Sequence, residues 1–345
     1  MFRLINKFLY RFNNNNDIIN VGIIGTGDIS LIHIKNLKKL SNIYRIISVC
    51  SRTLEKAIII AEKNDIPFAT NNYIDIINDD KIDAIFILTR HNTHVEIALK
   101  GIKANKAIFL EKPLAINLVE LKSIELPLKT FKKPFMVGFN RRYSSHIKYI
   151  KKLIDLRNNP IFAVYRQNDR NYINENWIRG PEGGGVIIGH FCHIIDLFNF
   201  LLGDDLVFIK GISVENNMDN YLGSDNFIII LKYTDGSIVN IVHTTFGSKL
   251  YPKDSLEIFY DDSVLEMSNY KNTKLYSLNG VKVKYNKIDK GYYNEIVEFA
   301  KAINENYNYS EHNKNIIDST QILFDIQNQF NNNSYFSFDN LTSEM

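Results

Sequence analysis

The stretch that decides the fold is IINVGIIGTGDIS, residues 18–30. Its apolar first half predicts a buried β-strand, and the apolar spacing of residues 34, 37 and 40 predicts a helix after the turn. Gly25 permits a tight turn, and Gly27 lets a pyrophosphate approach the backbone at the helix N-terminus, where free N–H groups favour anions. Ser30, in place of a third glycine, is still small enough for close helix packing. We therefore predict a dinucleotide site at Gly25, Thr26, Gly27, Asp28 and Ile29; a tight turn that binds no phosphate is the alternative.

The next predicted strand, residues 45–50, ends at Ser51 and Arg52. An acidic residue at this point would hold the ribose hydroxyl of NAD and would repel the extra phosphate of NADP. A hydroxyl and a guanidinium stand here instead, and both can bind a phosphate. The pair favours NADP over NAD, although an Arg52 that only stacks on the adenine would leave the preference open.

Strands and helices alternate up to residue 110, which is typical of a parallel sheet. The strands at 84–88 and 107–110 are fully apolar, and polar residues follow each of them. These are Thr89, His91 and His94 after the first strand, and Glu111 and Lys112 after the second. Ligands of open parallel sheets bind at the carboxyl ends of the strands. We therefore expect these residues to line the cofactor site, with loop support or helix capping as the alternative role of each histidine.

The second half follows a different pattern, because runs of strands replace the alternation after about residue 205. Asp235-Gly236 and Asn279-Gly280 are strong hairpin signals. The predicted fold class is α/β, with an N-terminal Rossmann domain and a C-terminal α/β domain that contains a large, mainly antiparallel open sheet. The predicted divisions are a tail at 1–16, the NAD(P)-binding domain at 17–138, a substrate-binding and oligomerisation domain at 139–330, and a tail at 331–345.

The composition excludes several classes of protein. A formal net charge of +3 over 345 residues is too small to indicate nucleic-acid binding. No apolar run approaches the ~20 residues of a membrane-spanning helix, and two cysteines, Cys50 and Cys192, make no disulfide framework. We expect a cytoplasmic protein with buried thiols. Residues 1–16 are interpreted as a tail or a helix packed on the protein, with a basic amphipathic helix on a membrane surface as the alternative.

The glycine-rich stretch 177–198 leads into a helix that carries His190 and His193. Residues three apart share one face of an α-helix. No third ligand of suitable spacing accompanies the two histidines, so we expect no metal site. A histidine that titrates near neutrality suits acid–base chemistry on a hydroxyl group. His193 is therefore a candidate catalytic residue, whereas His190 has an ordinary helix position as its alternative.

Taken together, these motifs resemble the glucose–fructose oxidoreductase / inositol dehydrogenase family. The resemblance covers residues 18–330. It rests on Gly25-Thr26-Gly27, on Thr89 to His94, on Glu111-Lys112-Pro113-Leu114-Ala115, and on Gly183-Gly184-Gly185 followed by His193 and Asp196. Further matches, which add residues 137–143, resemble one branch of the family. This branch is related to the oxidoreductase half of bi-domain proteins and includes stand-alone relatives linked to surface-polysaccharide and sugar metabolism.

The resemblance implies a nicotinamide cofactor along the first domain and a sugar, polyol or nucleotide sugar between the domains. It implies catalytic roles for Lys112 and His193, and a homodimer or homotetramer formed through the C-terminal sheet. The expected activity is hydride transfer between a secondary alcohol and nicotinamide. His193 takes the hydroxyl proton, and Lys112 stabilises the negative charge that develops on the oxygen. Glu111 would position Lys112, and the expected substrate contacts are Arg141, Trp177, Arg179 and His190.

One position departs from the family pattern. Many members carry an aspartate four residues before the catalytic histidine, and this chain has Gly189 there. A glycine supplies no carboxylate to orient the acid–base pair. This difference favours one alternative, a nicotinamide-binding regulatory or partner protein without catalysis. Another alternative is an enzyme that recycles a tightly bound cofactor.

Overall fold

The structure is a computed structural model, and it describes residues 18–169, 171, 177–203, 205–214, 223–305 and 310–331. The predicted tail at 1–16 lies outside the described residues. The chain forms two compact units. The first comprises residues up to Glu111, Ile124–Gly138 and Tyr292–Asn313; the second comprises Lys112–Ser123, Phe139–Gly291 and residues from Lys314 onward. The chain thus first passes from one unit to the other between Glu111 and Lys112.

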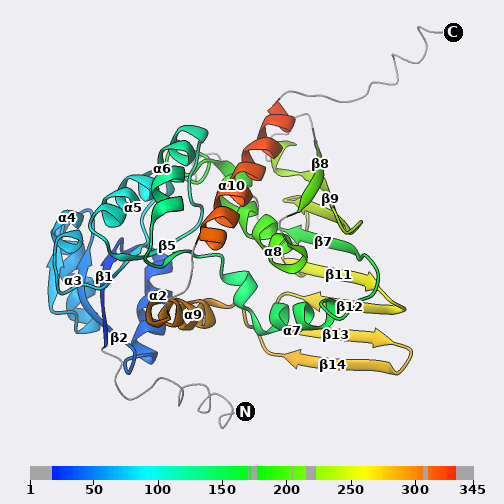
Figure 1. Ribbon diagram of the computed structural model, residues 1–345, viewed down its shortest axis with the longest axis horizontal. Coiled ribbons are helices and arrows are strands. Elements are labelled where there is room, and N and C mark those ends of the chain that lie inside the picture. Colours follow the sequence, from blue (N-terminus) through cyan, green and yellow to red (C-terminus); the bar gives the residue numbers. More distant parts are fainter. Residues whose placement is uncertain are drawn as a thin grey trace, which may run out of the picture. The chain divides into compact units, whose positions relative to one another are not determined.

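The first unit is built on a parallel sheet of six strands in the order β3-β2-β1-β4-β5-β6 (Figure 1). The strands are β1 Ile19–Ile24, β2 Tyr44–Cys50, β3 Phe68–Thr70, β4 Ala84–Ile87, β5 Ala107–Leu110 and β6 Phe135–Val137. Every residue of β4 and β5 is buried, as expected for strands inside a parallel sheet that is covered on both faces. The strand order changes direction between β1 and β4, so their carboxyl ends flank the point where open α/β sheets bind ligands.

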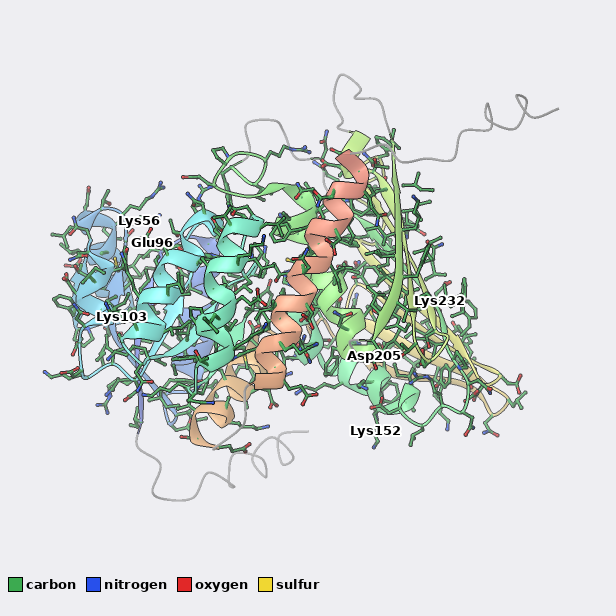
Figure 2. All side chains as sticks on the ribbon, turned by 45° about the horizontal axis from the view of Figure 1, so that its top comes forward. Lys56, Glu96, Lys103, Lys152, Asp205 and Lys232 are labelled. Atoms are coloured by element: carbon green, nitrogen blue, oxygen red, sulfur yellow. The ribbon has the colours of Figure 1, made fainter. Side chains whose placement is uncertain are left out.

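The helices of this sheet follow the predicted alternation. They are α2 Asp28–Lys39, α3 Leu54–Asn64, α4 Tyr73–Ile77 and α5 His94–Lys103. Charged side chains such as Lys56, Glu96 and Lys103 lie on the exposed faces of α3 and α5 (Figure 2). A further helix, α6 Leu118–Thr130, was missed by the sequence analysis, because Pro127 inside it is a helix-breaking signal.

A late segment of the chain returns to the first unit. Helix α9, Tyr292–Asn304, groups with α2, and the Tyr44 hydroxyl donates a hydrogen bond to the Ile296 carbonyl over 2.8 Å. The predicted division of the chain had placed these residues in the domain at 139–330. The contact joins residues more than 250 positions apart in the chain. A pattern of neighbouring residues cannot predict a contact over such a separation.

The second unit is built on an eight-stranded sheet in the order β14-β13-β12-β11-β7-β10-β9-β8 (Figure 1). The strands are β7 Phe162–Asn168, β8 Leu206–Ser213, β9 Phe227–Tyr233, β10 Ile238–Thr244, β11 Asp254–Tyr260, β12 Ser263–Ser268, β13 Asn272–Ser277 and β14 Gly280–Asn286. All neighbours are antiparallel except β7 and β10. The two predicted hairpin glycines, Gly236 and Gly280, adopt φ of 89° and 96°, which favours glycine. The predicted fold class is confirmed.

One face of the large sheet is buried. Along β9, the side chains alternate strictly between buried and exposed, so Ile229 and Leu231 are buried while Ile228 and Ile230 are exposed. Four α-helices of the described residues belong wholly or partly to this unit: the start of α6, α7 Ser145–Ile154, α8 Cys192–Leu202 and most of α10 Ser310–Asn331. All but three residues of α8 are among the buried residues of the chain, so this helix supplies much of the apolar core.

No helix among the described residues is long and apolar enough to cross a membrane. Both cysteines are free and buried, as predicted. Burial raises the pKa of the Cys50 thiol to about 11 and that of the Cys192 thiol to about 12. Neither cysteine is therefore a thiolate at neutral pH.

Candidate active site

The glycine turn after β1 forms a backbone cradle at the start of α2. Gly25 has a φ of +109°, and a Cβ there would strike the Leu88 carbonyl. Gly27 precedes the first residue of α2, and the space where its Cβ would lie is open. The buried Ser30 hydroxyl donates to the Gly27 carbonyl over 2.6 Å. The turn therefore offers accessible backbone at a helix N-terminus, which fits an anionic pyrophosphate.

Thr26 and Ser51 join this turn to the end of β2. Their hydroxyl oxygens are 2.7 Å apart, and both residues are buried. Arg52 is exposed, and its guanidinium forms no hydrogen bond or ion pair with the described residues. Asp28 and Ile29 begin α2, with Asp28 exposed. The first unit thus brings the glycine turn and the Ser51–Arg52 pair to the same end of the sheet.

The loop after β4 contains a short helical turn, η1 His91–Thr93. The Thr93 hydroxyl donates to the Thr89 hydroxyl over 2.7 Å, and Nε2 of the fully buried His94 lies 3.3 Å from the Thr89 carbonyl oxygen. His91 is also buried, with its ring centroid 5.5 Å from that of His94. The two buried histidines therefore pack beneath the loop. Of the three residues predicted to line the cofactor site here, Thr89, His91 and His94, only Thr89 is partly exposed.

Glu111 is buried and interacts with His33, a residue that the sequence analysis missed. Oε1 of Glu111 lies 2.8 Å from Nε2 of His33, which is fully buried on α2. The signal that points to His33 is its place three residues after Ser30, on the same buried side of the helix. The carboxylate of Glu111 thus has a partner in its own unit.

Lys112 is held by the backbone of the stretch that precedes α8. Its Nζ donates to the carbonyl oxygen of Gly189 over 2.7 Å. Gly189 lies in η3, Ile187–Phe191, a π-helical turn that runs directly into α8. The peptide bond between Lys112 and Pro113 is cis. A neutral carbonyl oxygen therefore accepts from the lysine, although position 189 has no carboxylate.

His193 lies on the first turn of α8 and is half-buried. Its ring centroid is 6.3 Å from that of Phe139, and Nδ1 has no hydrogen-bond partner among the described residues. Burial lowers the pKa of His193 well below its ordinary value, and the nearby cations Arg141 and Lys112 lower it further. The imidazole is therefore neutral at pH 7 and can accept a proton.

The π-helical turn corrects the predicted relation between His190 and His193. The prediction assumed a continuous α-helix, but His190 lies in η3 and His193 in α8, so α-helical spacing does not apply across them. Such turns occur often at functional sites. No group of three or more His, Cys, Asp or Glu side chains that could hold a metal occurs among the described residues.

The predicted arginines have carboxylate partners. Arg141 is buried, with Nη1 3.2 Å from Oδ1 of Asp254, and it also donates to the Tyr165 hydroxyl over 2.7 Å. Arg179 forms an ion pair with Asp225. Trp177 is half-buried and packs on a small apolar cluster of Ile178 and Val186. Each of these guanidiniums thus has a carboxylate counter-charge, as largely buried guanidiniums require, and their contacts with the substrate stay a prediction.

Known proteins resemble this chain along both units. Residues 19–139 match the model of the GFO/IDH/MocA oxidoreductase family with its NAD-binding Rossmann fold, and residues 161–266 match a GFO/IDH/MocA C-terminal domain. An uncharacterized oxidoreductase, YrbE, of Bacillus subtilis is 27% identical over 64% of this chain and 65% of its own length. Myo-inositol 2-dehydrogenase of Thermotoga maritima is 27% identical over 63% of this chain and 66% of its own length. The match thus spans just under two thirds of each of these relatives.

Solved structures share the fold over almost the whole chain. Levoglucosan dehydrogenase in complex with NADH and levoglucosan has a TM-score of 0.79 at 20% identity, covering 92% of this chain and 98% of that one. An oxidoreductase domain protein from Kribbella flavida has a TM-score of 0.81 at 16% identity with the same coverage. With both halves matched in order by the family's models, the chain belongs to the GFO/IDH/MocA oxidoreductase family.

Proposed function

We propose that the protein is an NAD(P)-dependent dehydrogenase that oxidises a secondary alcohol of a sugar or polyol, or reduces the matching ketone. One observation carries the proposal: a lysine ammonium held at 2.7 Å by the Gly189 carbonyl belongs to the same unit as a histidine that is neutral at pH 7. A cation and a proton acceptor are the two groups that alcohol oxidation requires.

In the proposed oxidation of an alcohol, His193 and Lys112 have different roles. The bound nicotinamide would supply the hydride acceptor. His193 takes the proton of the substrate hydroxyl, so the alcohol carbon can lose its hydride and become a carbonyl. Lys112 donates a hydrogen bond to the same oxygen and stabilises the negative charge that develops there. An ammonium has three donors, and the Gly189 carbonyl fixes the direction of one of them.

The first unit is the part of the chain that would hold the cofactor. The open space at Gly27 and the positive φ of Gly25 suit a pyrophosphate, and the exposed Arg52 suits the additional phosphate of NADP. We infer a preference for NADP, whereas the NADH bound to levoglucosan dehydrogenase favours NAD. Comparing kcat/KM for both cofactors in the wild type and in Arg52→Ala decides between them. The variant should lower the NADP value by about 10-fold, the effect of one charge-assisted contact, and change the NAD value far less.

The proposed substrate class is a sugar or polyol. Its support is the names of the relatives, which include inositol and levoglucosan dehydrogenases. Nucleotide sugars, and with them a role in surface-polysaccharide metabolism, are the narrower version that the sequence resemblance suggests.

The deciding experiment measures absorbance of reduced nicotinamide while the protein is incubated with each cofactor and a panel of inositols, aldoses and nucleotide sugars. Oxidation of any of them supports the proposal. Cofactor binding without turnover of any substrate, in either direction, would overturn it in favour of a non-catalytic protein. Reduced-nicotinamide absorbance in the purified protein before any addition would point instead to internal recycling of a retained cofactor. The Gly189 carbonyl contact weighs against the non-catalytic alternative, since Lys112 has an orienting partner.

A further inference from the structure

The second unit contains a lysine, Lys290, that has no role in the mechanism above. Its side chain is half-buried, and its ammonium forms no hydrogen bond or ion pair with the described residues. Burial lowers the pKa of Lys290, and the charge of Asp254 only partly opposes this effect. An ammonium that has lost part of its hydration without gaining a carboxylate is placed to bind an anion.

Three consecutive residues connect Lys290 with the proposed base. Phe139 contacts the His193 ring at a centroid distance of 6.3 Å. The side-chain amide of Asn140 donates to the Lys290 carbonyl oxygen over 2.7 Å. Arg141, the third residue, acts electrostatically on both His193 and Lys290. The backbone of Lys290 is therefore anchored to the segment that borders His193.

One cation near this segment has no carboxylate partner. Arg141 is paired with Asp254 at 3.2 Å, and Nζ of Lys253 is paired with Asp169 at 2.6 Å. Both carboxylates are buried, and each has its own cation. Lys290 adds a positive charge to this group that no described carboxylate pairs with. The Asp289 carboxylate, next to Lys290 in the chain, accepts from the backbone N–H groups of Ser145 and Gly291 instead. The unpaired ammonium of Lys290 therefore suits a ligand that brings a negative charge of its own.

We propose that Lys290 binds a compact oxyanion of the substrate, either a carboxylate or a phosphate, beside the hydroxyl group that His193 deprotonates. This proposal rests on the proposed function, and it narrows the substrate class from sugars and polyols in general to acidic or phosphorylated sugars. A neutral polyol would leave the half-buried ammonium without a counter-charge, whereas an anionic sugar supplies one together with a charge-assisted hydrogen bond.

The test compares D-glucose, D-glucuronate and D-glucose 6-phosphate as substrates of the wild type, Lys290→Met and Lys290→Arg. We expect kcat/KM of the wild type to be highest for one of the two anions. Lys290→Met should lower the ratio of anionic to neutral kcat/KM by about 10- to 100-fold, the value of one charge-assisted hydrogen bond. Lys290→Arg should restore most of the ratio because it keeps the charge. Lys152→Met is the matched control, since Lys152 is exposed on α7 of the same unit (Figure 2). The anion that shows the larger effect identifies carboxylate or phosphate.

Failure of this proposal is distinguishable from failure of the proposed function. Turnover of glucose that exceeds that of both anions, or an anion preference that Lys290→Met leaves intact, would overturn the role of Lys290 while dehydrogenase activity stands. If no sugar is oxidised, thermal unfolding can still test whether Lys290 binds an anion. At matched ionic strength, glucuronate or glucose 6-phosphate should raise the Tm of the wild type more than glucose does, and should lose this advantage in Lys290→Met. Equal shifts in both proteins would contradict the proposal.

Discussion

At the scale of single residues, the Gly189 carbonyl accepts a hydrogen bond from Lys112 at the position where the family resemblance predicts an aspartate. The Gly189 carbonyl can orient the Lys112 ammonium, but it carries no full charge and cannot accept a proton at neutral pH. Under the proposed mechanism, Lys112 therefore acts as a fixed cation, and proton transfer is left to His193.

Replacing Lys112 by Met should lower kcat by about 10²- to 10⁴-fold, because the oxygen of the substrate loses its charge-stabilising donor. Cofactor affinity, measured by fluorescence titration, should stay within a few-fold of the wild type, since the candidate cofactor residues belong largely to the first unit. Lys122→Met is the control, because Lys122 is exposed on α6 in the same unit. Full activity in Lys112→Met would refute the mechanism.

The pH dependence of the reaction should reflect the lowered pKa of His193. A base is active when deprotonated, and a lowered pKa keeps His193 deprotonated below the ordinary histidine value of about 6.5. The value of kcat/KM for alcohol oxidation should therefore stay constant as the pH falls through about 6.5 and should decline only at lower pH. His193→Asn should lower the rate and remove this acidic decline. A decline centred at or above pH 6.5 that persists in His193→Asn would assign it to another group.

At the scale of elements, helix α9 buries a carboxyl group inside the first unit. Glu295 is fully buried, and neither of its carboxyl oxygens has a hydrogen-bond partner among the described residues. Burial raises the pKa of Glu295 well above its ordinary value, and Glu111 raises it further. Glu295 is therefore protonated in the folded protein over a pH range in which the unfolded chain is ionised.

The burial of Glu295 should make the free energy of unfolding depend on pH. A raised folded-state pKa contributes stability below the unfolded pKa of about 4.3, and this stability is lost as the pH rises toward the folded value. Glu295→Gln cannot ionise, so its free energy of unfolding relative to the wild type should rise between about pH 5 and 8, by at most about 1.4 kcal/mol per pH unit. Urea denaturation at several pH values measures it. Glu298→Gln on the same helix, at a half-exposed residue paired with Lys301, should show no such trend.

At the scale of the whole molecule, the outer face of the large sheet carries large apolar side chains that are exposed. Exposed residues include Phe162 on β7, Ile228 and Ile230 on β9, and Phe259 on β11. Contiguous apolar patches of this kind mark interaction sites. They support the proposal that a second copy of the chain covers this face.

Light scattering after size-exclusion chromatography should therefore give a mass that is a multiple of the 40.0 kDa chain. Ile228→Lys together with Ile230→Lys should shift the mass to that of the monomer, because two charges on a buried interface are strongly unfavourable. Val119→Lys, at an exposed apolar residue on α6, serves as the control. A wild type that elutes as a 40.0 kDa monomer would contradict the proposal.

Much of the fold was predictable because its signals are local. The glycine turn, the apolar runs of β4 and β5 and the two hairpins each depend on residues within a few positions of one another. Most of the predicted strands and helices were confirmed with ends shifted by a residue or two. Helix α6 was missed because of Pro127, and the π-helical turn before α8 has no sequence signal that distinguishes it from an α-helix.

The sequence by itself determined the Rossmann turn, the order of strands and helices, the family, and the identity of Lys112 and His193 as candidates. Only the tertiary structure decided what surrounds them. The Gly189 carbonyl at Lys112, the His33 partner of Glu111 and the position of Lys290 beside Asn140 join residues 77, 78 and 150 positions apart. Burial and charge pairing depend on distances in space. Residue patterns along the chain indicate only its local conformation. These contacts between distant residues therefore cannot be predicted from such patterns and are seen only in the folded chain.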